Sequence, residues 1–266
     1  MKYIFPFLAL LLFLSACDSG PDLAQLCSDN PDICEEFSED NWCRQERKDT
    51  AFARFNLNQT GADKQKADLL LAYEDYANCM DHASKIEHIK LKHKKAVRVD
   101  NYLKAKEKIN ELSTQTINSL HPELLYYHWS RYLDKAALGK FLNLEGTAQL
   151  ETPQSQYNLA TYYVKKDLNK TLELLFHALE LYKPEQKIDP EIFKTLTTIY
   201  TDKKEFKQAY VWLKILGLYA PEDETFSKSS LNQMAKGYQL NQEFLDRVAA
   251  STLEKIKTGS FVSPRR

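Results

Sequence analysis

A repeating pattern of large apolar and small residues organises the second half of the chain. Apolar residues recur at helical spacing from position 159 to position 184, and the pattern returns 37 positions later. The matched pairs are Leu159 and Leu196, Tyr163 and Tyr200, Phe176 and Leu213, Leu179 and Leu216, and Pro184 and Pro221. A self-match of this length predicts helical hairpins that stack on one another, so the matched residues are expected to form the core.

Prolines punctuate the predicted hairpins. Four of them stand at positions 122, 153, 184 and 221, at intervals of 31, 31 and 37 residues. Because proline fits the first turn of a helix and stops the helix before it, each interval predicts two helices joined by a short turn. Two such turns are expected at residues 166–169 and 201–204, and a last pair of helices near residues 231–238 and 244–256.

The spacing in two of these intervals resembles the tetratricopeptide (TPR) repeat, although Leu172 and Thr197 stand where the repeat prefers smaller residues. The resemblance implies an all-α fold in which residues 121–257 form a TPR-like α-solenoid. It also implies that the first helix of each hairpin lines a groove. The groove positions are then Tyr157, Thr161, Lys165, Lys194 and Thr198. A lysine at such a position would bind the carboxylate of a peptide.

The start of the chain has the pattern of a signal peptide. Lys2 precedes an apolar run, residues 3–14, that is too short to cross a bilayer permanently. The sequence Leu14-Ser15-Ala16-Cys17 that follows resembles the lipobox of bacterial lipoproteins. The resemblance implies that residues 1–16 are removed and that Cys17 carries acyl chains, palmitate among them, which anchor the chain. An ordinary secretory signal followed by an unrelated cysteine is the alternative.

The expected location is the periplasmic side of a Gram-negative cell envelope. Asp18, directly after the anchored cysteine, resembles the retention signal of the inner membrane, so the inner membrane is favoured over the outer one. No second apolar run of about 18 residues occurs, and we therefore predict no transmembrane helix in the mature protein.

Four further cysteines predict two disulfides, because the periplasm is oxidising. Residue 61 is the midpoint between Cys43 and Cys79 and lies in a turn-like stretch, so a helical hairpin there would bring these two cysteines to the same height. Cys27 and Cys34 then close a small loop that holds the turn dipeptide Asn30-Pro31. The predicted pairs are Cys27–Cys34 and Cys43–Cys79. The cysteine spacings match no common zinc site and contain no Cys-x-x-Cys, so we predict no metal site and no redox pair.

A second resemblance concerns the region around these cysteines. It rests on two segments, Leu26-Cys27-x2-Asn30-Pro31-x-Ile33-Cys34 and Trp42-Cys43-Arg44-x2-Arg47. Behind a lipobox, they resemble an uncharacterised family of gammaproteobacterial lipoproteins. The resemblance implies a location in the cell envelope and does not imply an activity.

These patterns divide the chain into five parts. The signal peptide, residues 1–16, is followed by an acidic tether with a small disulfide loop, residues 17–40. An N-terminal helical region, residues 41–120, precedes the array at 121–257, and residues 258–266 are expected to be a disordered tail.

Between residues 62 and 121 there is neither proline nor glycine. We expect caps of new helices at residues 81–84 and 100–101, because Asp, Ser and Asn cap helices well. Two apolar stripes are expected to be buried: Leu69, Leu70, Tyr73, Tyr76 and Met80 in one, and Tyr102, Leu103, Ile109, Leu112 and Ile117 in the other.

Charge is balanced overall but segregated locally. The chain of 266 residues carries a net charge of −1, whereas residues 18–49 carry −7 and residues 85–108 carry +6. The basic stretch is predicted to be a solvated helix face near the acidic segment, and binding of anionic lipid head groups is the alternative. No aromatic residues alternate with the lysines before Tyr102, so no nucleic-acid partner is expected.

The sequence carries no recognisable catalytic motif. His88 and His93 are five residues apart and diverge on a helix, and there is no His-Glu-x-x-His, Gly-x-Ser-x-Gly or phosphate-binding glycine loop. We therefore predict no catalytic residue and no cofactor apart from the lipid on Cys17. The favoured function is a lipid-anchored scaffold or adaptor that binds an envelope protein or peptide, with no deep pocket of converging carboxylates or histidines. The alternative is an envelope enzyme, a cell-wall hydrolase or a transglycosylase-like protein.

Overall fold

The computed structural model describes residues 22–87 and 92–263, and its regular structure there is entirely helical. The predicted all-α class is therefore confirmed for the described residues. The expected signal peptide and lipobox, including Cys17, lie outside them. The chain divides into two compact units, Met1–Thr116 (unit 1) and Ile117–Arg266 (unit 2). Within the described residues, none of the helices combines the length and apolar character that crossing a membrane requires.

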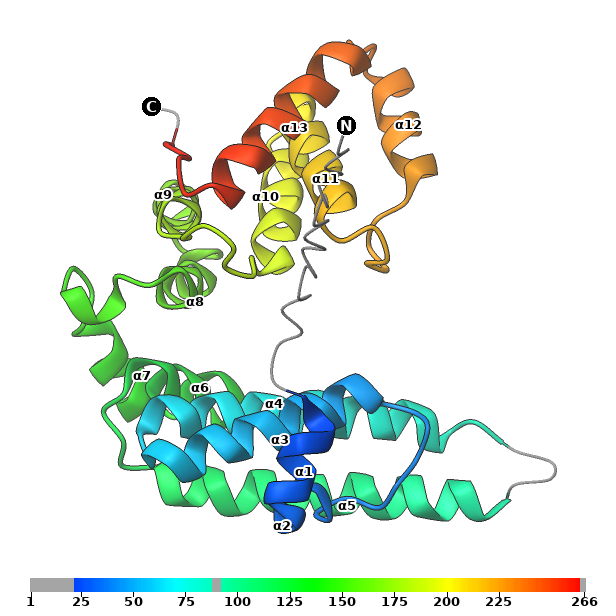
Figure 1. Ribbon diagram of the computed structural model, residues 1–266. Helices are drawn as coiled ribbons and strands as arrows, with labels where there is room; N and C mark the ends of the chain where they lie inside the picture. The colour runs from blue at the N-terminus through cyan, green and yellow to red at the C-terminus, as the bar shows by residue number, and fades with distance from the viewer. Residues whose placement is uncertain (1–21, 88–91, 264–266) are drawn as a thin grey trace, which may run out of the picture. The chain divides into compact units, whose positions relative to one another are not determined.

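Unit 1 is built on the predicted hairpin. Helix α3 (Arg44–Thr60) and helix α4 (Asp63–Ser84) pack against each other on either side of Gly61, and α5 (Lys92–Thr116) packs along α4 (Figure 1). Gly61 has φ 63° and donates its N–H to the carbonyl of Leu57. Glycine adopts this left-handed conformation without a Cβ clash, and this explains why α3 ends there.

The two predicted apolar stripes of unit 1 have different outcomes. All five residues of the stripe on α4 are buried, as expected. The prediction for the second stripe was only partly right, because Leu103 on α5 is 58% exposed and Ile117, directly after α5, is 55% exposed. The expected cap at residues 100–101 was also wrong, since α5 runs through it. Asn101 is buried there. Its side-chain oxygen accepts the backbone N–H of Ser38 and its side-chain N–H₂ donates to the Ser38 carbonyl, each over 2.9 Å. Sequence spacing does not reveal this long-range contact.

The N-terminal segment of unit 1 is not the acidic tether that we expected. From residue 22 onward it forms two short helices, α1 (Leu23–Asp29) and α2 (Pro31–Cys34), which pack against the rest of the unit. Leu26 and Ile33 form a small core with Ala51 of α3. Phe37 lies against the rings of Tyr73 and Tyr76, with centroids 6.2 and 4.4 Å away. Burial of these apolar side chains holds the acidic segment in place.

Unit 2 is a succession of helix pairs. Its helices are α6 (Pro122–Tyr132), α7 (Lys135–Leu142), a 3₁₀ turn η1 (Ala148–Leu150), α8 (Pro153–Tyr163), α9 (Leu168–Glu180), α10 (Pro190–Asp202), α11 (Phe206–Tyr219), α12 (Lys228–Gly237) and α13 (Gln242–Lys257). The main pairings are α6 with α7, α8 with α9, and α10 with α11, and α13 packs on α11. Pro122 and Pro153 begin helices as predicted, whereas Pro184 and Pro221 lie in the loops after α9 and α11.

Most of the repeated residues lie in the core of unit 2, but Pro184 and Pro221 are exposed and Tyr163 is only partly buried, so the prediction was only partly right. Leu159, Leu196, Leu179 and Leu216 are almost completely buried in one continuous cluster. Both predicted turns fall between paired helices, and in the first Asp167 accepts the N–H groups of Asn169 and Lys170. The apolar repeat therefore gives the interior of the unit, because each pair must bury its apolar face against a neighbour.

The end of the chain does not behave as the expected disordered tail, at least as far as residue 263. The ring of Phe261 stacks against Phe176 with centroids 6.4 Å apart, and Phe261 belongs to the core. The backbone N–H of Ser263 donates to Glu180 over 2.6 Å. A buried aromatic ring and a charge-assisted hydrogen bond explain why this segment is ordered.

Candidate functional site

Both predicted disulfides are confirmed. Cys27 bonds to Cys34 with Cα atoms 5.5 Å apart, and Cys43 bonds to Cys79 with Cα atoms 5.9 Å apart. The second disulfide joins the residue before α3 to the last turns of α4, so it closes the hairpin at its open end. Cys17, the expected lipidation site, lies outside the described residues.

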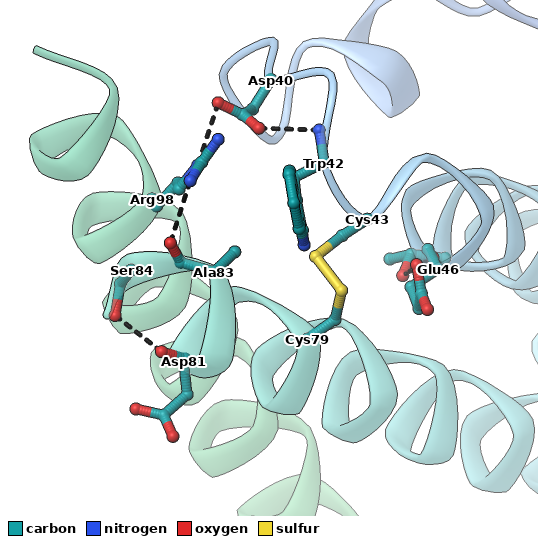
Figure 2. The surroundings of a disulfide bond; sticks show 10 residues. Asp40, Trp42, Cys43, Glu46, Cys79, Asp81, Ala83, Ser84 and Arg98 are labelled. Atoms are coloured by element: carbon teal, nitrogen blue, oxygen red, sulfur yellow. Dashed lines mark hydrogen bonds and ion pairs between the residues drawn. A yellow bond between two sulfur atoms is a disulfide. The ribbon is translucent and has the colours of Figure 1, made fainter. Parts of the chain in front are cut away.

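The Cys43–Cys79 disulfide borders a loop that presents Trp42 and is held by buried polar contacts. The carboxylate of Asp40 is 1% exposed and pairs with the guanidinium of Arg98, which is 2% exposed, over 3.2 Å. Arg98 also donates to the carbonyl of Ala83, and Asp40 accepts the backbone N–H of Trp42 at 2.7 Å. Figure 2 shows the Trp42 ring between the guanidinium and the disulfide. Trp42 is nevertheless 46% exposed, so the loop holds a large aromatic side chain at the surface of unit 1.

The Arg98–Asp40 pair joins the basic stretch to the acidic segment, as the sequence led us to expect. Other basic side chains of that stretch pair with near neighbours in sequence. The pairs are Lys85 with Asp81, Lys95 with Glu87, and Lys108 with Glu111. Within the described residues, the basic stretch thus has both a structural ion pair and a solvated face.

One group of possible metal ligands occurs among the described residues. The ligand atoms of Cys43, Glu46 and Cys79 lie within 4.8 Å of one another. The two sulfur atoms are bonded to each other, so neither is a thiolate that could bind zinc. With the disulfide formed, this cluster does not provide the ligands of a metal site.

The carboxyl of Glu36, in the N-terminal segment, is buried in unit 1. Desolvation raises its pKa, and the charge of Arg54, 3.4 Å away, partly opposes that shift. The hydroxyl of Tyr73 donates to both carboxylate oxygens, at 3.0 and 3.1 Å. Each partner comes from a packed helix, so the cluster joins the N-terminal segment to α3 and α4.

Four of the five predicted groove residues of unit 2 lie on the first helices of successive pairs, whereas Lys165 lies in the turn after α8, contrary to the expectation. Tyr157 and Thr161 are partly buried on α8, and the hydroxyl of Thr161 is 2.9 Å from that of Tyr126 on α6. Burial raises the pKa of Tyr157 to about 12, and the nearby Thr195 side chain on α10 partly opposes the shift. These contacts connect α6, α8 and α10 into one face, which we call the first-helix face. Two more predicted residues, Lys165 and Thr198, are exposed.

Lys194 does not have the role that the sequence suggested. Its ammonium pairs with Glu191 at 2.6 Å and with Asp223 at 2.8 Å. The lysine therefore joins α10 to the loop after α11, and two carboxylates of the chain itself occupy the position expected for a peptide carboxylate. A tertiary contact with a loop residue is the reason, and the helical pattern does not show it.

The first-helix face also carries aromatic residues that the sequence analysis missed. Tyr126 and Trp129 of α6 and Tyr162 of α8 are partly exposed. Their ring centroids lie 5.6 Å apart from Tyr126 to Trp129 and 5.6 Å from Trp129 to Tyr162. The ammonium of Lys166 lies 3.2 Å from the Tyr162 centroid. The signal was the i, i+3 spacing of Tyr126 and Trp129, in an interval whose repeat pattern is weak.

A second feature of unit 2 is an open cleft of about 400 Å³ between residues 145–151 and helices α8 and α9. Its lining residues are Glu145, Gly146, Glu151, Gln156, Leu159, Lys170, Glu173, Leu174 and His177. Glu145 pairs with Lys170 at 3.1 Å and accepts the hydroxyl of Tyr163 at 2.7 Å. The cleft brings three carboxylates and a histidine together, which the scaffold hypothesis did not expect. We call it the Glu–His cleft.

His177 joins two elements through its two ring nitrogens. Nε2 lies 2.7 Å from Glu151, and Nδ1 lies 3.4 Å from Glu180, the residue that holds Ser263. Burial opposes protonation of the imidazole, but the hydrogen bonds and charges of Glu151 and Glu180 outweigh it and raise the pKa. The folded protein therefore favours the imidazolium more strongly than the unfolded chain does.

We expect the stability that His177 contributes to decrease as pH rises. A histidine whose folded-state pKa lies above its ordinary value of 6.5 contributes fully below pH 6.5, and the contribution is lost as pH rises through the folded-state pKa. The measurement is the Tm difference between the wild type and His177→Gln across this pH range. A difference that stays constant with pH would contradict the assignment, and His93→Gln, at an exposed position of α5, is the control.

Residues 14–214 match a family described as protein of unknown function (DUF2989). The match confirms the expectation of a family without an established activity. No curated protein and no solved structure gives a significant match to the chain.

Proposed function

The chain belongs to the DUF2989 family of proteins of unknown function, and we propose that it is a lipid-anchored helical-repeat scaffold of the bacterial envelope. The expected partner is an envelope protein or peptide in the periplasm. The proposal combines an anchor at the N-terminus with a binding surface on unit 2, and it requires no catalytic step.

The proposed anchor is the acylated Cys17, on the inner rather than the outer membrane. Its support is the lipobox, residues 14–17, together with Asp18. The two disulfides agree with an oxidising compartment such as the periplasm. On this proposal, acyl chains supply the membrane attachment.

The proposed architecture of unit 2 is a divergent TPR-like solenoid. Its support is the correspondence between the α8/α9 and α10/α11 pairs, in which Leu159 matches Leu196 and Leu179 matches Leu216 at buried positions. In this class of repeat, stacked first helices present a continuous surface.

The observation that carries the function is the first-helix face. It joins three helices through the Tyr126–Thr161 hydrogen bond and the contact of Tyr157 with Thr195, and it exposes part of Trp129 beside Tyr162. Trp and Tyr supply large contact areas at a low cost in side-chain entropy, and they are enriched at binding hot spots. A protein partner that lies across α6, α8 and α10 fits this arrangement.

The scaffold proposal predicts position-specific crosslinking in cells. A photo-crosslinking residue at exposed Thr198 on α10 should capture a discrete partner, whereas the same residue at exposed Thr114 on α5 should not. Trp129→Ala combined with Tyr162→Ala should reduce the Thr198 crosslink about tenfold or more, since hot-spot aromatic residues each contribute about 2 kcal/mol or more. Trp42→Ala is the matched control, because it removes an exposed aromatic from unit 1. Equal crosslinking from both positions would contradict the proposal.

The Glu–His cleft supports a second candidate, a hydrolase of cell-wall fragments. A carboxyl pair can act as general acid and base, and Glu173 lies in the cleft beside His177 and Glu151. In this alternative we expect the purified chain to release soluble products from peptidoglycan. Glu173→Gln should then abolish release, while Glu243→Gln, at an exposed position of α13, should not. Equal release by both variants would remove the enzyme alternative.

A further inference from the structure

A second cleft in unit 2, of about 390 Å³, lies among α11, α12 and α13. It shares no residue with the first-helix face or with the Glu–His cleft. Only Tyr210 and Lys214 of its lining fall within the residues that match the family, so family membership does not describe this site. Its volume is that of a pocket for a small ligand, which is about 300–1,000 Å³.

The apolar wall of this cleft depends on Gly217. A Cβ atom at this position would overlap the ring of Phe226, so the absence of a side chain lets the ring lie directly against α11. The exposed Leu218 and the buried Leu231 continue the wall. The cleft can therefore accept a small aliphatic group.

The acidic residue of the cleft is already neutralised. Asp246 accepts the hydroxyl of Tyr210 through Oδ1 at 2.8 Å and the ammonium of Lys214 through Oδ2 at 2.8 Å. Burial is the largest cause of a rise in the pKa of Tyr210 to about 12, and the hydrogen bond to Asp246 adds to it, so the phenol remains a donor at neutral pH. Asp246 and Lys214 together contribute no net charge to the cleft.

The remaining polar groups are mostly donors. Lys228, at the start of α12, has an ammonium that no carboxylate of the described residues neutralises. The side-chain N–H of Gln242 donates to the carbonyl oxygen of Asn232 at 3.3 Å, so the Asn232 amide presents its own N–H₂. The cleft therefore combines one net positive charge, a free amide donor and an aliphatic wall.

We propose that this cleft binds an aliphatic carboxylate, either a free acyl amino acid or the C-terminal residue of a peptide. The carboxylate pairs with Lys228 and accepts from Asn232, and the aliphatic side chain lies against Phe226 and Leu218. A charge-assisted hydrogen bond supplies orientation, and apolar burial supplies the rest of the affinity.

The test uses N-acetyl-leucine, titrated calorimetrically into the full-length chain in detergent micelles, with N-acetyl-leucinamide as its neutral counterpart. We expect saturable binding of the acid and about tenfold weaker binding of the amide, because the amide lacks the charge that Lys228 recognises. Equal affinity for the two compounds, or no saturable binding of the acid, would overturn the proposal.

Two variants locate the binding. Lys228→Met should weaken binding of the acid about tenfold. Lys236→Met, on the same helix but outside the lining, should leave it unchanged. Both lysines are exposed, so both variants are expected to fold, and equal effects of the two would overturn the site.

A longer probe separates the two ligand sources. Acetyl-Ala-Ala-Leu carries the same terminal residue on a peptide chain. Tighter binding than N-acetyl-leucine assigns the cleft to peptide C-termini, and equal or weaker binding assigns it to free acyl amino acids.

Discussion

Arg98→Met is expected to lower the free energy of unfolding of unit 1 by about 3–5 kcal/mol, the usual cost of removing one partner from a buried ion pair. The variant leaves the Asp40 carboxylate buried without its cation and removes the donor to the Ala83 carbonyl. The measurement is denaturant-dependent hydrogen exchange of the α4 amides, which reports the opening of unit 1 by itself.

A double mutant tests the cause of this effect. Arg98→Met combined with Asp40→Leu removes both charges, and it should cost less than Arg98→Met alone because no buried charge remains unpaired. Lys94→Met, on the same helix, is the control for loss of a positive charge. If the double variant is as unstable as the sum of the two single variants, the pair is not coupled and the explanation fails.

Removal of the Cys43–Cys79 disulfide, by Cys43→Ala with Cys79→Ala, is expected to cost about 4 kcal/mol. The disulfide closes a loop with a sequence separation of 36, and the unfolded chain gains conformational freedom when that loop opens. The same exchange of the α4 amides measures the loss. We also expect Trp42 to become more mobile, since the loop that presents it ends at Cys43.

The Cys27–Cys34 disulfide is the matched comparison. Its sequence separation is 7, so the chain-entropy model gives about 2.5 kcal/mol for its removal. We expect the two losses to differ in this order. A larger loss from the shorter loop would show that native contacts of the N-terminal segment, and not loop entropy, dominate.

Local patterns predicted much of this fold correctly. The hairpin around Gly61, the two disulfides and the buried repeat positions follow from spacing along the chain, because each joins or orients residues within one or two adjacent helices. Helical periodicity predicts which side of a helix is apolar. In a helical hairpin, cysteines at equal distances in sequence from the turn lie opposite each other, so their spacing predicts the disulfide.

The sequence by itself thus determined a helical protein with two disulfide-closed loops and a core built from repeated apolar positions. Only the tertiary structure decided what the polar residues do. Asn101 was expected to start a helix but holds Ser38, and Lys194 was expected to face a ligand but binds Asp223. The first-helix face, the Glu–His cleft and the cleft among α11, α12 and α13 likewise combine side chains from several helices. Apolar residues are placed by periodicity, whereas a polar residue is placed by partners that lie far away in sequence, and a single sequence does not specify those partners.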